Sequence, residues 1–219
     1  MKLDIQNLRL DPTIPPLAPV FCTRPAIIHA VGVNVSLFFQ AIMGLIAPSQ
    51  GSITWNNTLL SQDRQIYKSI WQRSRLGIRY LPSPKQIFRG LSIEQSLKLA
   101  IPPKIGSHLD ALQEIYAQLP ILAANRQRQV WQLSGGQQQI LAIACCLIGH
   151  AQLLLLEDPL AGLSIPLQQQ VWQLLLSHVQ KKQALVILSS MQALYPQDSP
   201  DFPTISFQQW SLTDPLQLG

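Results

Sequence analysis

Blocks of apolar and polar residues follow one another along the chain, and their periods predict alternating strands and helices. Residues 3–10 alternate with a period of two, as in an edge strand with one buried face. The leucine run at 153–156 is continuously apolar, which is typical of a strand buried on both faces of a parallel sheet. The expected strands are 3–10, 26–31, 52–55, 77–81, 153–157 and 184–188, with a further one possible at 204–207.

Helical periodicity and capping residues define the remaining blocks, apart from a proline-rich stretch at 11–25 that is expected to be a loop. Gly44 is expected to end the first helix, and Ser92 with Gln95 three residues later is a capping box. The expected helices are 36–43, 65–75, 93–100, 107–119, 136–148 and 164–181. Strands alternating with helices predict an α/β fold with a mostly parallel sheet flanked by helices.

Between about residues 84 and 136 the helical blocks follow one another without a strand. We therefore expect a helical subdomain inserted into a single domain, whose core covers about 1–83 and 137–219. A chain of 219 residues and 24.5 kDa that is 47% hydrophobic can bury a core of that size.

The first candidate for chemistry comes at the end of this insert. Ser134, Gly135, Gly136 and Gln137 open a helix, and the first turn of a helix leaves backbone N–H groups without intrahelical partners. The helix dipole adds partial positive charge at this end, and glycine allows close approach of a phosphate. These residues predict a phosphate-binding helix start, with an ordinary serine cap as the structural alternative.

The second candidate lies at the end of the leucine run, where Glu157 and Asp158 are adjacent. In a parallel sheet this is the carboxyl edge, where ligands bind. Carboxylates there can hold Mg²⁺ or position water beside a phosphate.

Together the two motifs resemble the signature motif and the Walker B strand of ABC-type ATPases. Three further stretches, Gly77–Pro82, Ile87–Glu94 and Ile115–Leu122, resemble the branched-chain amino acid and urea importer branch of that family. Ala41–Leu45, followed by Gly51–Ile53, matches the family after its phosphate loop. The resemblance implies a P-loop NTPase-like fold whose helical subdomain carries the signature motif.

The resemblance also implies a function. The chain would be an ATP-binding subunit of a membrane transporter, cytoplasmic and peripheral on the inner face of the membrane. It would use ATP and Mg²⁺ and work with membrane permease subunits. In such dimers each nucleotide lies between one subunit's Walker A loop and the other's signature helix, here Ser134–Gln137.

The segment that corresponds to the Walker A loop departs from the family pattern G-x-x-x-x-G-K-[ST]. It is about three residues short, keeps Gly32 and Asn34, and has Val35 in the place of the lysine. Ser36 remains where the Mg²⁺-binding hydroxyl belongs. Losing the lysine and part of the amide cradle is expected to remove about 4 kcal/mol or more, which turns micromolar binding into about millimolar.

Other family positions also differ. Glu157 stands at the Mg²⁺-ligand position and Asp158 at the catalytic glutamate position, where the shorter side chain holds its oxygens about an ångström farther from the attacking water. The remaining departures are Pro12 for an adenine-stacking ring, Ser83 for a glutamine, Ser164 for an aspartate and Met191 for the switch histidine.

The cysteine content and the apolar segments indicate the cellular compartment in which the chain is expected. The cysteines Cys22, Cys145 and Cys146 are too few for a disulfide framework, and Cys145 and Cys146 are expected to pack in the core. With no signal-peptide pattern after Met1, a reducing cytoplasm is expected. Residues 26–47 carry no charge and are long enough to span a bilayer, but their polar residues favour a buried strand, loop and helix.

The net charge of +5 is concentrated between Arg64 and Lys104, where nine basic residues accompany the single acid Glu94. This stretch is either a solvated surface or a face toward anionic lipid headgroups or an acidic partner. Nucleic acid is not expected as a partner of this stretch.

Three functions remain open. The chain can be a degenerate subunit of an amino acid or urea importer that pairs with an intact homologue and donates Ser134–Gln137 to that partner's ATP. It can be an active ATPase with atypical residues, in which Asp158 is catalytic, Gly32, Asn34 and Ser36 bind nucleotide, and Ser36 and Glu157 hold Mg²⁺. It can also be a non-catalytic scaffold or regulatory protein, or the product of a decaying gene.

Overall fold

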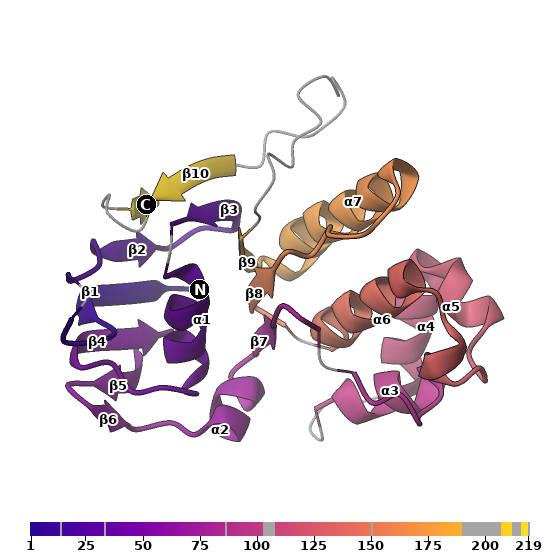
Figure 1. The fold of residues 1–219 in the computed structure, drawn as a ribbon, viewed down its shortest axis with the longest axis horizontal. Coiled ribbons are helices and arrows are strands. Elements are labelled where there is room, and N and C mark those ends of the chain that lie inside the picture. Colours follow the sequence, from indigo (N-terminus) through magenta and orange to yellow (C-terminus); the bar gives the residue numbers. More distant parts are fainter. Residues whose placement is uncertain are drawn as a thin grey trace.

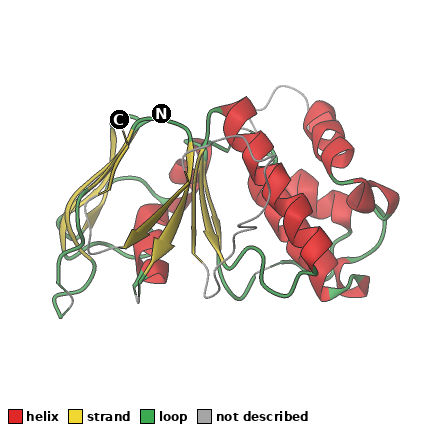
Figure 2. Cartoon of the chain, turned by 90° about the horizontal axis from the view of Figure 1, so that it is seen from above, coloured by secondary structure: helices red, strands yellow, loops and turns green. Residues whose placement is uncertain are grey.

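The computed structural model describes residues 1–13, 15–32, 34–85, 87–102, 108–149, 151–189, 207–211 and 216–218 (Figure 1). These residues form layers. Seen from above in Figure 2, a first sheet is followed by helices, then by a second sheet, and then by a larger group of helices.

The central sheet is parallel, and every element around the candidate site is attached to it. Its strands, in spatial order, are β10 (Phe207–Ser211), β3 (Ala26–Val31), β9 (Leu185–Ser189), β8 (Leu153–Glu157) and β7 (Ile78–Leu81). Alternate residues of one strand enter different cores: Leu154 and Leu156 pack with the larger helix group, and Leu155 packs toward the first sheet. Burial on both faces explains why this strand is continuously apolar.

The first sheet has six strands and is antiparallel except for the parallel pair β11–β2. In spatial order they are β11 (Leu216–Leu218), β2 (Val20–Cys22), β1 (Leu3–Arg9), β4 (Gln50–Trp55), β5 (Thr58–Gln62) and β6 (Gln65–Ile66).

This sheet corrects two expectations. Residues 3–10 are not an edge strand, because β1 pairs with β2 on one side and β4 on the other, and β2 lies inside the expected loop. Strand β5 was missed as well. It follows a tight turn at Asn56 and Asn57, whose φ angles of 47° and 61° are those that two-residue hairpin turns require.

Helix α1 (Val35–Met43) joins β3 to the first sheet and lies between the two sheets (Figures 1 and 2). It ends, as expected, at Gly44, which has a φ of 79°. The helix expected over 65–75 is only α2 (Ile70–Arg75), because β6 takes the first residues and the Ser69 capping box starts the helix.

The larger helix group packs on the other face of the central sheet (Figure 1). It contains α3 (Ile93–Ala100), α4 (His108–Gln118), α5 (Pro120–Ala124), the 3-10 turn η1 (Val130–Gln132), α6 (Gly135–Leu147) and α7 (Ile165–Lys182). The Ser92–Gln95 capping box is present at the start of α3. Among the described residues no strand interrupts the chain between β7 and β8, as the expected helical insert requires; its boundaries stay a prediction.

Three further expectations concerned the apolar segment 26–47, the cysteines and the possible strand at 204–207. The apolar segment 26–47 forms β3 and α1, and no helix within the described ranges is long and apolar enough to cross a membrane. The three cysteines are free thiols, two of them buried and Cys145 partly so. Strand β10 begins at Phe207, so the rest of the possible strand 204–207 lies outside the described residues.

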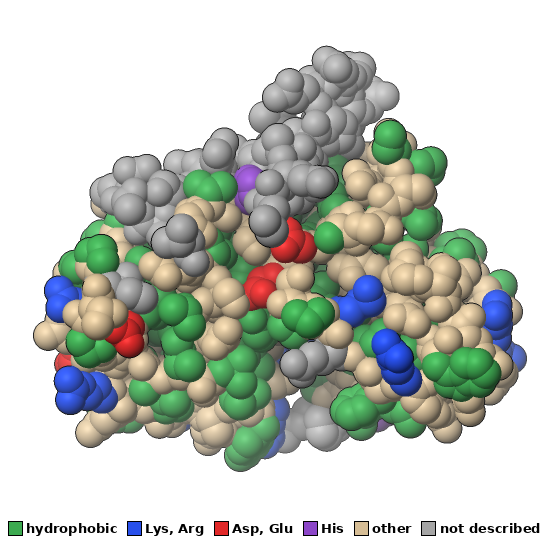
Figure 3. All heavy atoms as spheres, viewed as in Figure 1, with side chains coloured by type: hydrophobic (Ala, Val, Ile, Leu, Met, Phe, Trp, Pro, Cys, Tyr) green, Lys and Arg blue, Asp and Glu red, His purple; other side chains and the backbone are tan. Residues whose placement is uncertain are grey.

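The basic stretch from Arg64 to Lys104 is not one charged surface. Arg73 is fully buried and Arg79 is only 8% exposed, so two of its cations lie inside the fold. In Figure 3 the basic side chains of the visible face lie in separate places. Arg73 and Arg79 therefore do not contribute to an exposed basic face.

Candidate functional site

The carboxyl end of β8 carries a buried carboxylate whose two oxygens both accept hydrogen bonds. Glu157 is 7% exposed. Its Oε1 accepts from the Tyr80 hydroxyl at 2.6 Å, and its Oε2 accepts from the backbone N–H of Ser83 at 3.0 Å. Strand β7 and the turn after it therefore hold this side chain in place.

Ser36 lies on the other side of the same tyrosine. Burial, together with the hydrogen bond and the charge of Glu157, raises the pKa of Tyr80, while hydrogen bonds with Ser36 and Gln40 act in the opposite direction. The Gln40 amide also donates to the Ser36 hydroxyl at 3.1 Å. The structure thus gathers Ser36 and Glu157, the two residues proposed for Mg²⁺, into one cluster with Tyr80 between them.

This cluster offers few protein ligands to Mg²⁺. A divalent cation takes several oxygen ligands. Each oxygen of Glu157 already accepts one hydrogen bond, which leaves it one further lone pair. Within the described ranges, no three His, Cys, Asp or Glu side chains gather into a metal-binding group. A cation held here would therefore take most of its ligands from water or from a bound phosphate.

The β3–α1 connection also offers little to a phosphate. Only three residues, 32–34, separate the two elements, and Val33 lies outside the described residues. Gly32 is exposed with a φ of 132°, and the Asn34 side chain makes no capping hydrogen bond. Val35, in the place of the family's lysine, is 5% exposed and belongs to the core that α1 shares with the first sheet.

The start of α6, in contrast, is exposed and has a complete capping box. The Ser134 hydroxyl accepts from the Gln137 N–H at 3.2 Å, and the Gln137 side chain accepts from the Ser134 N–H at 3.0 Å. This capping box leaves the N–H groups of Gly135 and Gly136 without a partner among the described residues. Ser134 and Gly135 are exposed, and a Cβ added to Gly135 would meet nothing within 4 Å.

These two regions do not meet within one chain. Helices α1 and α6 lie on opposite faces of the central sheet (Figures 1 and 2). Any site that uses both the Ser36 cluster and the Ser134–Gln137 helix start therefore needs a second chain.

The other candidate residues can be placed individually. Asp158 has a left-handed φ of 43°, which is uncommon outside glycine, and its N–H donates to the Ser189 carbonyl at 2.9 Å. Pro12 and Ser83 are exposed, and Ser164 is the exposed cap of α7. Met191 lies outside the described residues.

Sequence reasoning missed Tyr80 and Gln40 as members of the cluster. A signal for Tyr80 was present: residues of β7 alternate in direction, so Ile78 and Tyr80 share the face toward α1. Gln40 lies one turn after Ser36 on the same helix face, where residues four apart are neighbours.

Comparison with known proteins shows which family this chain resembles. A family model described as "ABC transporter" matches residues 30–161, more than half of the chain. The chain is 30% identical over 143 residues to the probable branched-chain amino acid transport ATP-binding protein LivF of Archaeoglobus fulgidus, covering 64% of the chain and 57% of that protein. It is 28% identical over 140 residues to the molybdenum import ATP-binding protein ModC of Vibrio parahaemolyticus, covering 64% of the chain and 36% of that protein.

A third relative is the thiamine import ATP-binding protein ThiQ of Yersinia pseudotuberculosis, 30% identical over 153 residues, covering 69% of the chain and 61% of that protein. The chain thus spans about half the length of the curated relatives that it matches.

Solved structures agree on the fold. A putative ABC transporter ATP-binding protein of Pyrococcus furiosus superposes with a TM-score of 0.72 at 17% identity, covering 97% of this chain and 98% of that one. A nucleotide-free ATP-binding cassette gives 0.70 at 18% identity, covering 87% and 82%. The expected α/β fold with a parallel sheet and flanking helices is confirmed.

Proposed function

The chain belongs to the ABC transporter family, and from that premise we propose that it is an ATP-binding subunit that serves mainly as a signature donor. In this proposal Ser134–Gln137 contacts the triphosphate of ATP held by a homologous, intact subunit in a heterodimer. ATP and Mg²⁺ are then held chiefly by the partner. The pair works on the cytoplasmic face of a membrane, together with permease subunits.

The observation that carries this proposal is the contrast between two helix starts. At the start of α6 a complete capping box orders the first turn, and the exposed Gly135 leaves open space beside its Cα. At the start of α1 the residue that should supply a lysine ammonium is instead the buried Val35. One end suits a phosphate and the other does not.

The engaged carboxylate supports the same division of roles. Tyr80 and Ser83 both donate to Glu157, so a metal ion would share that carboxylate with two hydrogen bonds, and no three His, Cys, Asp or Glu side chains of the described residues form a metal-binding group. No catalytic step is therefore assigned to this chain's own cluster.

For the transported solute we propose an amino acid or urea importer. Its support is the local resemblance of Gly77–Pro82 and Ile87–Glu94 to that branch, together with the amino acid transport name of the Archaeoglobus relative. Uptake of labelled leucine and of labelled urea by cells with and without the gene tests this part, and unchanged uptake of both would contradict it.

A second candidate is an active ATPase with unusual site chemistry. The observation in its favour is that Ser36, Tyr80 and Glu157 are still gathered beside the carboxyl edge of the sheet. Each oxygen of Glu157 keeps one lone pair for a cation beside the hydrogen bond that it accepts.

The test separates signature donation from simple folding effects. Ser134→Ala and Ser92→Ala each remove the hydroxyl of a capping box, so each should cost about 1 kcal/mol of stability. In the complex purified through a tag on this chain, we expect Ser134→Ala to lower ATP hydrolysis about tenfold to a hundredfold, which is the loss of one charge-assisted hydrogen bond. Ser92→Ala should leave it within about twofold of the parent. Equal activities for the two variants would refute the proposal.

A further inference from the structure

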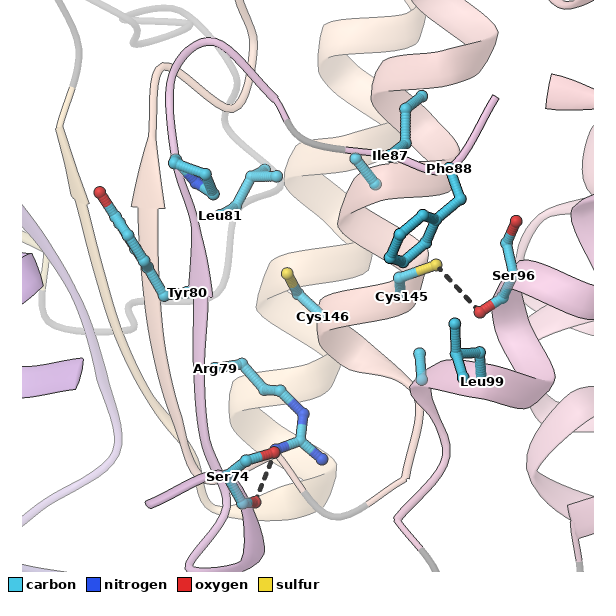
Figure 4. Close-up of a pocket in the computed structure, with 13 residues that line it drawn as sticks. Ser74, Arg79, Tyr80, Leu81, Ile87, Phe88, Ser96, Leu99, Cys145 and Cys146 are labelled. Carbon is cyan, nitrogen blue, oxygen red and sulfur yellow. Dashed lines mark hydrogen bonds between the residues drawn. The ribbon is translucent and has the colours of Figure 1, made fainter. Parts of the chain in front are cut away.

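A pocket of about 350 Å³ lies between β7, α3 and α6, and Tyr80 is the one residue of the Ser36 cluster among its described lining residues. Much of its wall is apolar, with Leu81, Ile87, Phe88, Leu99 and Ala142 among the lining residues. Figure 4 shows Arg79 and Ser74 at one end, Phe88 and Ile87 at the other, and Cys145 and Cys146 between them. Ligand pockets usually measure about 300–1,000 Å³, so this one suits a small ligand.

Arg79 is the one cationic side chain among the residues that line this pocket. It faces α6 because alternation along β7 turns Ile78 and Tyr80 toward α1. Its Nη1 donates to the carbonyl and the hydroxyl of Ser74, both at 2.6 Å. No described Asp or Glu forms a salt bridge with it.

Buried Arg73 shows what a purely structural arginine looks like in this fold. Its five N–H donors meet five acceptors: Nε donates to Lys68, Nη1 to Ala41 and Ile42, and Nη2 to Leu60 and Ser61. These bonds anchor the end of α1, and no donor is left over.

Arg79 differs because Nη1 alone makes its hydrogen bonds within the described residues. Its Nε and Nη2 are not among the fully buried atoms that lack a partner, so they keep access to the pocket. Three N–H donors of a guanidinium thus remain for something that enters. A carboxylate is the planar anion that this edge of a guanidinium binds with two parallel hydrogen bonds.

We propose that this pocket binds a small amphipathic monocarboxylate, with its carboxylate on Nε and Nη2 of Arg79 and its apolar body against Phe88, Leu99 and Ala142. The two thiols do not oppose the anion, because burial raises the pKa of Cys145 and of Cys146 to about 12 and keeps both neutral at pH 7. No acid lines the pocket, so a zwitterionic amino acid would have an unpaired ammonium there.

The bound ligand would join the central sheet to the helical group, since its two ends contact β7 and α3. It should therefore raise the melting temperature of the full chain, as any ligand that binds only the folded state does. This inference is independent of the proposed signature donation, because no residue of Ser134–Gln137 lines the pocket, and Tyr80 is the one member of the Ser36 cluster among the described lining residues.

Three probes of similar shape test the chemistry by calorimetric titration of the full chain. They are 4-methylpentanoate, its uncharged amide and leucine. We expect the carboxylate to bind saturably and at least about tenfold more tightly than either of the others, since only the carboxylate pairs with Arg79 without adding an ammonium. Equal affinity for acid and amide, or no saturable binding of the acid, overturns the proposal.

A matched pair of exposed leucines tests the location without disturbing the core. Leu99 lines the pocket and Leu109 lies on α4 outside it, and both are 64% exposed. Leu99→Glu should weaken 4-methylpentanoate binding at least about tenfold by placing a carboxylate in the wall of the pocket, where it repels the anion and replaces apolar contact, whereas Leu109→Glu should bind like the parent. Arg79→Gln should also lose the preference for acid over amide. Should Arg79→Gln fail to fold, the leucine pair still decides, and binding unchanged in Leu99→Glu overturns the assigned pocket.

Discussion

The starts of α1 and α6 invite comparison because both are helix N-termini in a family that uses two such ends around each nucleotide. At α6 small residues keep the N–H groups open and a capping box makes the first turn regular. At α1 the first helical residue is a buried valine, and the preceding connection is only three residues long. The two ends of one fold can therefore diverge independently, because they lie on opposite faces of the sheet and, in the proposed dimer, would contact different nucleotides.

The largest expected effect comes from putting a negative charge at the open helix start. Gly135→Asp faces empty space and has no left-handed φ to satisfy, and an acid in the first turn of a helix is favourable by about 0.3–1 kcal/mol. We expect the variant to fold at least as stably as the parent, while ATP hydrolysis by the assembled complex falls by about a hundredfold or more through repulsion of the phosphates.

Gly90→Asp is the matched control for this variant, because Gly90 is also exposed and open within 4 Å. It should leave hydrolysis close to that of the parent. An active Gly135→Asp complex would show that the helix start of α6 does not contact a phosphate. The proposed functional difference between the starts of α6 and α1 would then be wrong.

An effect of similar size is expected on stability at the start of α1. Val35→Lys places an ammonium in the core position that the family gives to a phosphate-binding lysine, and an unpaired buried charge costs about 3 kcal/mol or more. Ser36→Lys, at the exposed neighbour, should change the free energy of unfolding by only about 0.5 kcal/mol. Urea denaturation measures both. A Val35→Lys variant as stable as the parent would mean that the side chain is free to leave the core.

The Ser36 cluster gives the smallest predicted effect. Tyr80→Phe removes the donor to Glu157 Oε1 and should destabilise the fold by about 1–3 kcal/mol at pH 7. The pKa of Tyr80 is raised in the folded state, so its contribution is complete below about pH 10, the ordinary tyrosine value, and declines as the pH rises beyond it.

Stability measured from pH 7 upward should therefore fall less steeply in Tyr80→Phe than in the parent. The cysteines, whose pKa values are also raised, contribute equally to both proteins. Parallel pH profiles would show that the Tyr80 hydroxyl is not coupled to Glu157.

Features of the fold that depend on residues close together in the sequence were predicted correctly. The leucine run of β8 and the glycine after α1 each have one dominant physical cause, and both appear where expected. Strand β1 was misplaced as an edge because its partners lie far along the chain, and alternation reveals one buried face but not how many neighbours a strand has.

The same limit applies to the candidate site. Glu157 was expected at the sheet edge and is there, but its engagement with Tyr80 and Ser83 comes from tertiary contacts more than seventy positions apart along the chain. Arg79 was counted as a surface charge because a guanidinium rarely enters a protein interior. Only the structure shows that β7 turns it inward.

The central claim is that this chain alone does not bind nucleotide with useful affinity. Titration calorimetry of the isolated full chain with Mg-ATP tests this claim most directly. The account predicts no saturation below about 1 mM, and an identical result for Ser36→Ala. A micromolar dissociation constant that Ser36→Ala abolishes would contradict it.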